Sequence, residues 1–417
     1  MRRLTGLWRH ADFLRLWIGQ TISRFGSLVG ISAVAFTAIL VLKATPFQLG
    51  LLSAARLAPG FLTGLAAGAW ADRLRRRPIL IAADIGRALL LATIPATASV
   101  GLLRIEQLYI VTLLVSVLNV FFDVAYESYL PSLVTSAELV EGNSKLAATS
   151  SVAEFGGFAI SGWLVQLFTA PIAILVDAIS FVVSAISLWL IRTPEPQPAR
   201  AEHPNMRREI AEGLSEVMHH PLLRALGACT LSKEFFGGIY GALVMLYMVR
   251  DLGFAPAILG CIWALGGVSS LLGAAATKPA TTRFGMGATM ITGLMIFSIT
   301  LFFVPLARGA TLIAAVLLIL QQILGDGPAT AYEITHVTLR QTIAPERLLG
   351  RVNASVVFLA LGSTLTGSLL GGLLGETIGV RPTLFLAASG SLLSTLWLVF
   401  SPLRTLHAAP ASMEAKA

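Results

Sequence analysis

Long runs of apolar and small residues recur along the whole chain and constrain its fold more than any other feature. Each run has about 20 or more residues, enough to cross a hydrocarbon core of roughly 30 Å as a helix. Within lipid the backbone has no water to bind, so a helix, which pairs its own N–H and C=O groups, is the expected form. We count twelve expected spans: 15–42, 46–71, 78–101, 105–131, 145–169, 171–191, 221–249, 256–279, 286–306, 309–339, 349–376 and 380–403.

The composition agrees with an all-α membrane protein. Charged residues make up 12% of the chain, against roughly 25% in soluble domains, and the mean hydropathy is +0.79. The start, "MRRLTGLWRHADFLRLWIGQ", has no short apolar core followed by a small-residue cleavage site, so we expect it to be retained. Cys229 and Cys261 both fall in expected spans, which predicts no disulfide framework. No Cys/His or carboxylate cluster has ligand spacing, so we expect no metal and no cofactor.

The basic residues are divided unevenly between the two sides of the membrane. If the helices alternate, five of the 30 lie on one side and four within spans, and the other 21 share a side with both termini. Cytoplasmic loops carry the excess of Lys and Arg, so both termini are predicted to be cytoplasmic. This sidedness explains the net charge of +8 without a nucleic-acid partner. The minority side carries Lys43, Arg104, Arg250, Arg308 and Arg381, and the spans contain Arg24, Arg56, Arg87 and Lys233.

The two halves of the chain repeat each other. "NSKLAATSSVAEFGGFAISG" from Asn143 aligns with "NASVVFLALGSTLTGSLLGG" from Asn353, which places Gly157 over Gly367 and Gly162 over Gly372. "LGLLSAARLAPGFLTGLAAGAWADR" in the second span likewise resembles "LGCIWALGGVSSLLGAAATKPATTR" in the eighth. Such a repeat predicts two six-helix bundles around a binding cavity. The expected domains are an N-terminal bundle at 1–192, a cytoplasmic linker with a surface helix at 193–218, and a C-terminal bundle with a short tail at 219–417.

The twelve-span plan, the linker and the string "GAWADRLRRRP" between spans two and three resemble the major facilitator superfamily. Its loop signature reads roughly Gly, three residues, Asp, Arg, two residues, then basic residues; Gly68, Asp72, Arg73, Arg76 and Arg77 match it. Arg75 stands where the family often has Gly. "FLRLWIGQTISRFG", "ADIGRALLL", "LVDAISF" and "EGLSEVMHHPLLRAL" are similar to the bacterial exporter branch with macrolide-efflux and enterobactin-exporter-like proteins. The resemblance implies transport by alternating access and a location in a bacterial inner membrane.

Two interpretations of the basic loop are open. It is either a topological anchor alone, or also part of a gate on the cytoplasmic side. The resemblance implies that Asp72 latches against the start of the eleventh helix, where Arg351 and the helix dipole favour an anion.

The loop arginines have candidate partners in two pairs of acidic residues. Asp123 and Glu127 share a helix face in span four, and Asp326 and Glu333 share one in span ten. These pairs are either inner-gate partners of the loop or permanent salt bridges.

Several ionisable residues are predicted deep within spans, where a charge costs about 2.5–3.5 kcal/mol on insertion scales. Glu154 is either a proton-coupling carboxylate or a neutral group in a close helix contact. Arg24 is a candidate for the cavity or for inner closure, and at most one of Lys233 and Glu234 is expected to face a cavity. Asp84 and Arg87 are expected to form a fixed structural pair, and Asp177 to meet water or a helix end.

The resulting functional hypothesis is a secondary transporter that exports a moderately hydrophobic small molecule in exchange for protons, working as a monomer in the bilayer. An uptake or facilitative carrier is the nearest alternative, and a non-transporting regulatory or assembly protein is the alternative from another class. No nucleophile, base and orienting partner can be assembled, so an enzyme is not expected. Candidate cavity aromatics, whose default role is packing, are Phe121, Phe122, Tyr126, Phe235, Phe236 and Tyr240.

Overall fold

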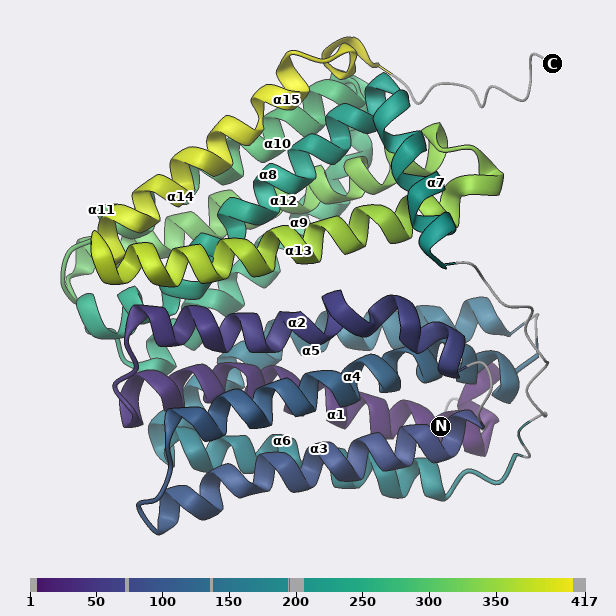
Figure 1. Cartoon of the computed structure of the whole chain (residues 1–417), viewed down its shortest axis with the longest axis vertical. Coiled ribbons are helices and arrows are strands. Elements are labelled where there is room, and N and C mark those ends of the chain that lie inside the picture. The colour runs from purple at the N-terminus through teal and green to yellow at the C-terminus, as the bar shows by residue number, and fades with distance from the viewer. Residues whose placement is uncertain (1–5, 72–74, 136–137, 194, 196–205, 408–417) are drawn as a thin grey trace, which may run out of the picture. The chain divides into compact units, whose positions relative to one another are not determined.

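The structure, a computed structural model, describes residues 6–71, 75–135, 138–193, 195 and 206–407. Side chains within helices are described except at 6, 63–71, 151, 154–155, 206–210 and 346. All regular secondary structure in the described residues is helical, and these residues contain no strand. The helices are α1 (Ala11–Phe36), α2 (Pro46–Ala71), α3 (Arg76–Ser99), α4 (Ile105–Leu133), α5 (Leu139–Leu167), α6 (Ala170–Trp189), α7 (Met206–His219), α8 (Pro221–Leu246), α9 (Pro256–Phe284), α10 (Met286–Thr300), α11 (Phe303–Leu306), α12 (Leu312–Ile343), α13 (Leu349–Thr377), α14 (Val380–Ser394) and α15 (Leu396–Val399) (Figure 1).

All twelve expected spans coincide with helices, so the all-α membrane fold is confirmed. Within the described residues, nine helical segments are long and apolar enough to cross a membrane. The other three expected spans correspond to helices α2, α5 and α8. Two expected spans are broken near one end, into α10 with α11 and α14 with α15. The helices expose many large apolar side chains, for example Leu312 at 82% and Phe400 at 81%, as a lipid-facing surface requires.

The internal repeat is visible in the helix boundaries. A π-helical turn follows α1 at Thr37–Val41 and follows α8 at Tyr247–Asp251, 210 positions later. Pro46 starts α2 and Pro256 starts α9 with the same offset, as do Leu139 of α5 and Leu349 of α13. Equivalent sequence therefore folds into equivalent structure in both halves.

Lys43 and Gly253 occupy equivalent turns but differ in their fit to the backbone. Lys43 has φ +51° and Gly253 has φ +77°, a region where a side chain costs roughly 1–2 kcal/mol and glycine pays nothing. We expect Lys43→Gly to raise the free energy of unfolding by about 1 kcal/mol. Gly253→Lys, the reciprocal change, should lower it by a similar amount. Equilibrium unfolding in mixed micelles would measure both, and equal signs for the two variants would contradict this account.

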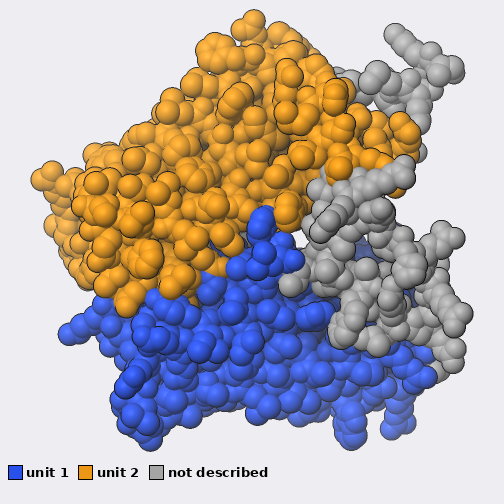
Figure 2. All heavy atoms as spheres, in the orientation of Figure 1, with its two compact units in different colours: residues 1–44, 55–204, 255–261 blue, residues 45–54, 205–254, 262–417 orange. Residues whose placement is uncertain are grey.

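The chain divides into two compact units, which Figure 2 colours separately. Unit 1 comprises residues 1–44, 55–204 and 255–261. Within it α1 packs along α6 and α5, and α3 packs along α6 and α4 (Figure 1). Its largest buried side chains include Phe13, Leu16, Leu80 and Tyr129, where α1, α3 and α4 meet.

Unit 2 comprises residues 45–54, 205–254 and 262–417. Here α8 packs between α13 and α14, α10 packs along α12, and the short amphipathic helix α7 lies on α13. Its core includes Leu226, Cys229, Leu294 and Tyr332.

Matched glycine contacts show how tightly some helices approach. In unit 2, a Cβ on Gly372 would lie 3.0 Å from the Cα atom of Gly50. In unit 1, a Cβ on Gly162 would lie 3.1 Å from the Cα atom of Gly260. The 210-residue offset relates the two pairs, so the repeat conserves these close backbone contacts as well as the helix order.

Candidate functional site

Arg76 and Arg77 of the basic loop bind the end of α6 and the segment that follows it. The backbone N–H groups of Arg76 and Arg77 donate to the Glu195 carboxylate at 2.6 and 3.2 Å, which caps the start of α3. The Arg77 guanidinium donates to the carbonyl oxygens of Leu188 and Trp189 at the end of α6. These contacts fasten α3 to α6. Asp72 and Arg73 lie outside the described residues, and Gly68 is described only as part of the α2 backbone.

Arg351, the expected partner of Asp72, pairs with Glu212 of α7. Both side chains are about one-third exposed, at 38% and 33%, so the pair contributes little stability by itself. The backbones approach closely here as well, because a Cβ on Gly213 would overlap the carbonyl oxygen of Arg351. Helix α7 is thus docked on the start of α13 within unit 2.

A polar pocket of about 280 Å³ lies among α1, α4 and α5 of unit 1. Arg24 lines it from α1, Tyr126 and Glu127 line it from α4, and Asn143 lines it from α5. Three of the residues predicted from the sequence therefore meet in one pocket. It presents a cation, a carboxylate, an amide and a phenol to any occupant.

Asp123 and the two phenylalanines beside it lie one turn from this pocket on α4. Asp123 is exposed and is close enough to Arg24 and Arg87 for their charges to act on it. Phe122 is only 4% exposed and stacks on Tyr126 with ring centroids 5.9 Å apart. Phe121 is partly buried. Phe122 therefore belongs to the helix packing, in line with its default role.

Asp84 and Arg87 form the structural pair that the sequence predicts, buried between α3 and its neighbours. Arg87 Nη2 donates to Asp84 Oδ1, and Arg87 Nη1 donates to Asn119 Oδ1 at 2.7 Å. The guanidinium lies between the rings of Phe122 and Phe181, 4.1 Å from each centroid. Cation–π contacts of this kind replace part of the hydration that burial removes.

The prediction that Asp177 meets water or a helix end is wrong. Asp177 is 5% exposed and lies in α6 against the backbone of α1. The prediction overlooked the pattern Gly26-x-x-x-Gly30, which is the sequence signal for a close helix contact opposite this residue.

Unit 2 contains an ion cluster built from α8, α12 and α13. Lys233 Nζ pairs with Glu333 and, at 3.1 Å, with Glu234. Thr364 Oγ1 hydrogen-bonds to Glu234 Oε2 at 3.1 Å. Lys233 is 18% exposed, whereas Glu234 and Glu333 are 32% and 49% exposed. Two carboxylates thus share one ammonium group, and their free faces remain accessible.

Polar side chains that the sequence did not single out surround this cluster. Lys233 lies 5.3 Å from the ring centroid of Tyr332, whose hydroxyl is 3.7 Å from the sulfur of Cys229. His336, one turn further along α12, is 4% exposed and hydrogen-bonds to Thr230 at 3.0 Å. The only signal in the sequence is the helical spacing of Tyr332, Glu333 and His336.

The remaining predicted residues have other surroundings. Asp326 of α12 abuts Gly266 of α9, so it does not share the partner of Glu333. The Phe236 ring lies against Gly390 of α14, and Phe235 packs edge to face on Phe236. Tyr240 is buried and donates to the Leu301 carbonyl at 3.1 Å. Glu154 lies in α5, and its side chain is outside the described part of the structure.

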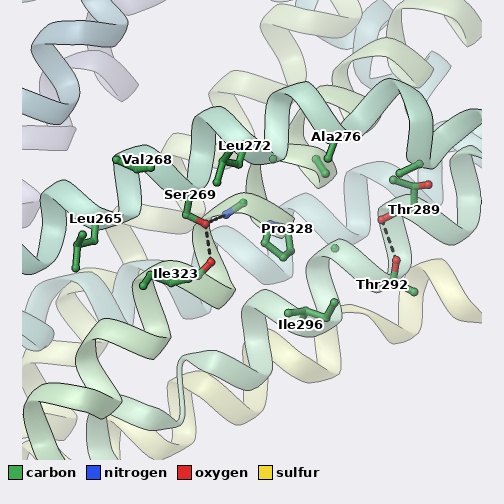
Figure 3. Close-up of a pocket in the computed structure, with 15 residues that line it drawn as sticks. Leu265, Val268, Ser269, Leu272, Ala276, Thr289, Thr292, Ile296, Ile323 and Pro328 are labelled. Carbon is green, nitrogen blue, oxygen red and sulfur yellow. Dashed lines mark hydrogen bonds between the residues drawn. The ribbon is translucent and has the colours of Figure 1, made fainter.

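An apolar pocket of about 590 Å³ lies in unit 2 among α9, α10 and α12 (Figure 3). Its walls include Leu265 and Leu272 of α9, Ile296 of α10, and Ile323 and Pro328 of α12. The volume is within the range of roughly 300–1,000 Å³ that small-molecule sites occupy.

At the wall of this pocket, the hydroxyl group of Ser269 on α9 contacts the backbone of α12 (Figure 3). Its hydroxyl donates to the Ile323 carbonyl at 2.6 Å and accepts from the Gly327 N–H at 3.0 Å, and so bridges two groups one helical turn apart. Pro328 follows directly and removes another helix donor. A side chain inserted beside a proline is a recognised cause of helix bending.

The helix order, the repeat and the charged groups held within spans define a transporter of the major facilitator fold. A family model described as "Transmembrane secretion effector" matches residues 6–416, and the chain belongs to that family of the superfamily. It is therefore a multi-pass membrane protein, and it belongs to a class of transporters that carry small molecules. The superfamily assignment made from the loop motif is confirmed.

Relatives and solved structures agree with this assignment. The chain is 27% identical over 394 residues to the uncharacterized MFS-type transporter YfiS of Bacillus subtilis, covering 88% of this chain and 87% of that protein. It is 26% identical to the multidrug efflux pump Tap of Mycolicibacterium fortuitum, covering 89% and 92%. The nucleoside transporter NupG has a TM-score of 0.74 at 14% identity, covering 93% of this chain and 98% of that one. A bacterial homologue of the iron transporter ferroportin has 0.73 at 19%, covering 95% and 99%.

Proposed function

We propose that this protein exports a moderately hydrophobic small molecule from the cytoplasm in exchange for protons. The observation that carries the proposal is the Lys233–Glu234–Glu333 cluster, in which partly exposed charges are kept within membrane-spanning helices. A charge kept at such a depth generally serves a substrate or ion pathway. The polar pocket around Arg24 and Glu127 is a second place of this kind, in unit 1.

The direction and the substrate class rest on the relatives. Tap is named a multidrug efflux pump, and a 215-residue region is 24% identical to macrolide efflux protein A of Streptococcus pyogenes. The apolar pocket lined by Leu272 and Ile296 suits the apolar part of such a molecule. The excess of Lys and Arg on one side supports an inner-membrane protein with both termini in the cytoplasm.

Proton exchange is the proposed energy source, with Glu154, Arg24, Lys233 and Glu234 as candidate groups. A carboxylate that shares one cation with a second carboxylate is a suitable proton acceptor, because binding a proton removes the surplus negative charge. In the loop, Asp72 and Arg73 remain proposed gate residues together with Arg76 and Arg77. The contacts of Arg77 with α6 support an anchoring role for this part of the loop.

A growth assay tests the proposal most directly. An efflux-deficient bacterial host expressing the wild-type protein would be challenged with a panel of dyes, macrolides and other toxic compounds. We expect a severalfold rise in the inhibitory concentration for at least one compound, lost in Glu333→Gln. Asp251→Asn, an exposed change in the turn after α8, is the matched control and should remain active.

Inverted membrane vesicles then give the direction. With the resistance compound as the probe, an imposed outward proton gradient, with the vesicle interior acidic, should drive its accumulation in the vesicles. Accumulation only under the opposite gradient would identify an uptake carrier. No flux and no resistance would favour the non-transporting alternative.

A further inference from the structure

The contact between α1 and α6 in unit 1 encloses a carboxyl group that has no ion-pair partner. Small residues line the contact on both helices. Gln20 Nε2 donates to Ser184 Oγ at 3.2 Å, and Ser187 Oγ donates to the Arg15 carbonyl at 2.5 Å. The positions of Gly26 and Gly30 on α1 leave room for Ser180 and Asp177 on α6: a Cβ on Gly26 would overlap Ser180 Oγ, and one on Gly30 would overlap Asp177 Oδ2. The Asp177 carboxyl group therefore lies directly on the α1 backbone.

The charges around Asp177 do not balance. Arg87 of α3 is the cation that faces Asp177, and Arg87 is already paired with Asp84. Within the described residues, Asp177 has no ion pair within 4 Å. Of the other helices, α4 contributes Asp123, which is exposed and faces Arg24 of α1, and α1 presents the hydroxyl of Ser27. The only acidic residue in the adjoining part of α5 is Glu154, whose side chain is not described. Two buried aspartates thus share one guanidinium, and an ionised Asp177 would be a buried charge without compensation.

The hydrogen bonds of Ser180 indicate how the imbalance is resolved. Ser180 Oγ lies 2.8 Å from the backbone carbonyl of Asp177 and 3.3 Å from Asp177 Oδ1. A hydroxyl group has one proton, which the shorter contact with the carbonyl uses. The contact with Oδ1 is then a hydrogen bond only if the carboxyl group donates to Ser180 Oγ, and for this it must itself carry a proton.

From this geometry we propose that Asp177 is a proton-binding site, occupied at neutral pH and enclosed by the α1–α6 contact. The proton comes from a hydronium ion of the solvent, which is left as a water molecule, and it bonds to a carboxylate oxygen of Asp177. Asp84 stays ionised as the partner of Arg87. Release of the proton requires α1 to separate from α6 near Gly30, which ties proton exchange to a movement of α1. The use of this proton in transport rests on the proposed function, whereas its presence does not.

Infrared spectroscopy of the purified full-length protein, without any substrate, tests the site. We expect the spectrum of the wild type minus that of Asp177→Asn, at pH 7, to contain a positive carboxylic-acid C=O band and no carboxylate band. We also expect Asp177→Asn to remain monodisperse, because an amide matches the shape of a neutral carboxyl group. Asp251→Asn, the control, should show the opposite difference spectrum, with carboxylate bands only, since its carboxyl group is exposed.

Two results would overturn the site. One is carboxylate bands in the Asp177→Asn difference spectrum, which would show an ionised group. The other is loss of the folded protein in Asp177→Asn together with a stable Asp177→Glu variant, which would show that the charge is needed. A protein that passes the infrared test but exports nothing in the growth assay would refute the proposed function and leave the proton site in place.

Discussion

Asp84→Asn should lower the free energy of unfolding by about 3–5 kcal/mol, the usual cost of removing one partner of a buried ion pair. Arg87 is only 4% exposed, and Asp84 is its one ion-pair partner among the described residues. The substitution therefore leaves a buried positive charge without a partner. Asn119 and the two phenylalanine rings would remain, but none of them carries a negative charge. Unfolding at equilibrium in lipid bicelles would measure the loss.

A second substitution shows whether the unpaired charge causes this loss. Asp84→Asn combined with Arg87→Met removes both charges, and we expect it to recover most of the lost stability, because apolar replacements of a buried pair are often neutral. If the double variant is as unstable as Asp84→Asn, packing at position 84 is the cause and the interpretation of the pair is wrong.

Lys233→Met should reduce resistance in the efflux-deficient host to the level of an empty vector. The change removes the one cation shared by Glu234 and Glu333 and leaves two carboxylates side by side within membrane-spanning helices. Because these carboxylates are 32% and 49% exposed, water can still solvate them, and we expect the protein to remain folded. Growth assays with the resistance compound, together with size-exclusion chromatography of the purified variant, would measure both outcomes.

Lys233→Arg is the matched variant for this cluster. It keeps the positive charge but changes its shape, so it should retain part of the resistance. Full resistance in Lys233→Met would show that the cluster is not needed for export. Loss of activity in Lys233→Arg with normal resistance in Lys233→Met would point to steric effects in place of charge.

The candidate sites show where prediction from the sequence succeeds. The Asp84–Arg87 pair could be predicted because the residues are three apart on one helix, where their side chains meet whatever the rest of the fold does. The grouping of Arg24 with Tyr126 and Glu127 was only partly predicted, since a shared pocket depends on how α1 lies against α4. Glu333 was predicted to be either an inner-gate partner of the basic loop or a member of a permanent salt bridge, and the structure pairs it with Lys233, 100 positions earlier in the chain.

The contacts of loop and linker residues, in contrast, could not be predicted from the sequence. Glu195 caps α3 from 118 and 119 positions away, and Glu212 pairs with Arg351 from 139 positions away. Their sequence neighbourhood, "RTPEPQPARAEHPNMRREIAEGLSEVMHHP", is polar and rich in proline, which is typical of a linker and identifies no partner. Contacts of this kind arise when separate helices are brought together, so no local pattern contains them.

The sequence by itself determined that the chain is a bundle of membrane-spanning helices in two repeated halves, because the length of each apolar run and the absence of water in lipid leave the backbone no other form. It also determined the superfamily, since the loop motif and the repeat are local or periodic features. Only the tertiary structure decided which charges are paired, which are surplus and which are enclosed. The reason is physical: the effect of a buried charge depends on the distance to its partners, and here those partners come from other helices, as Asp177 on the backbone of α1 shows.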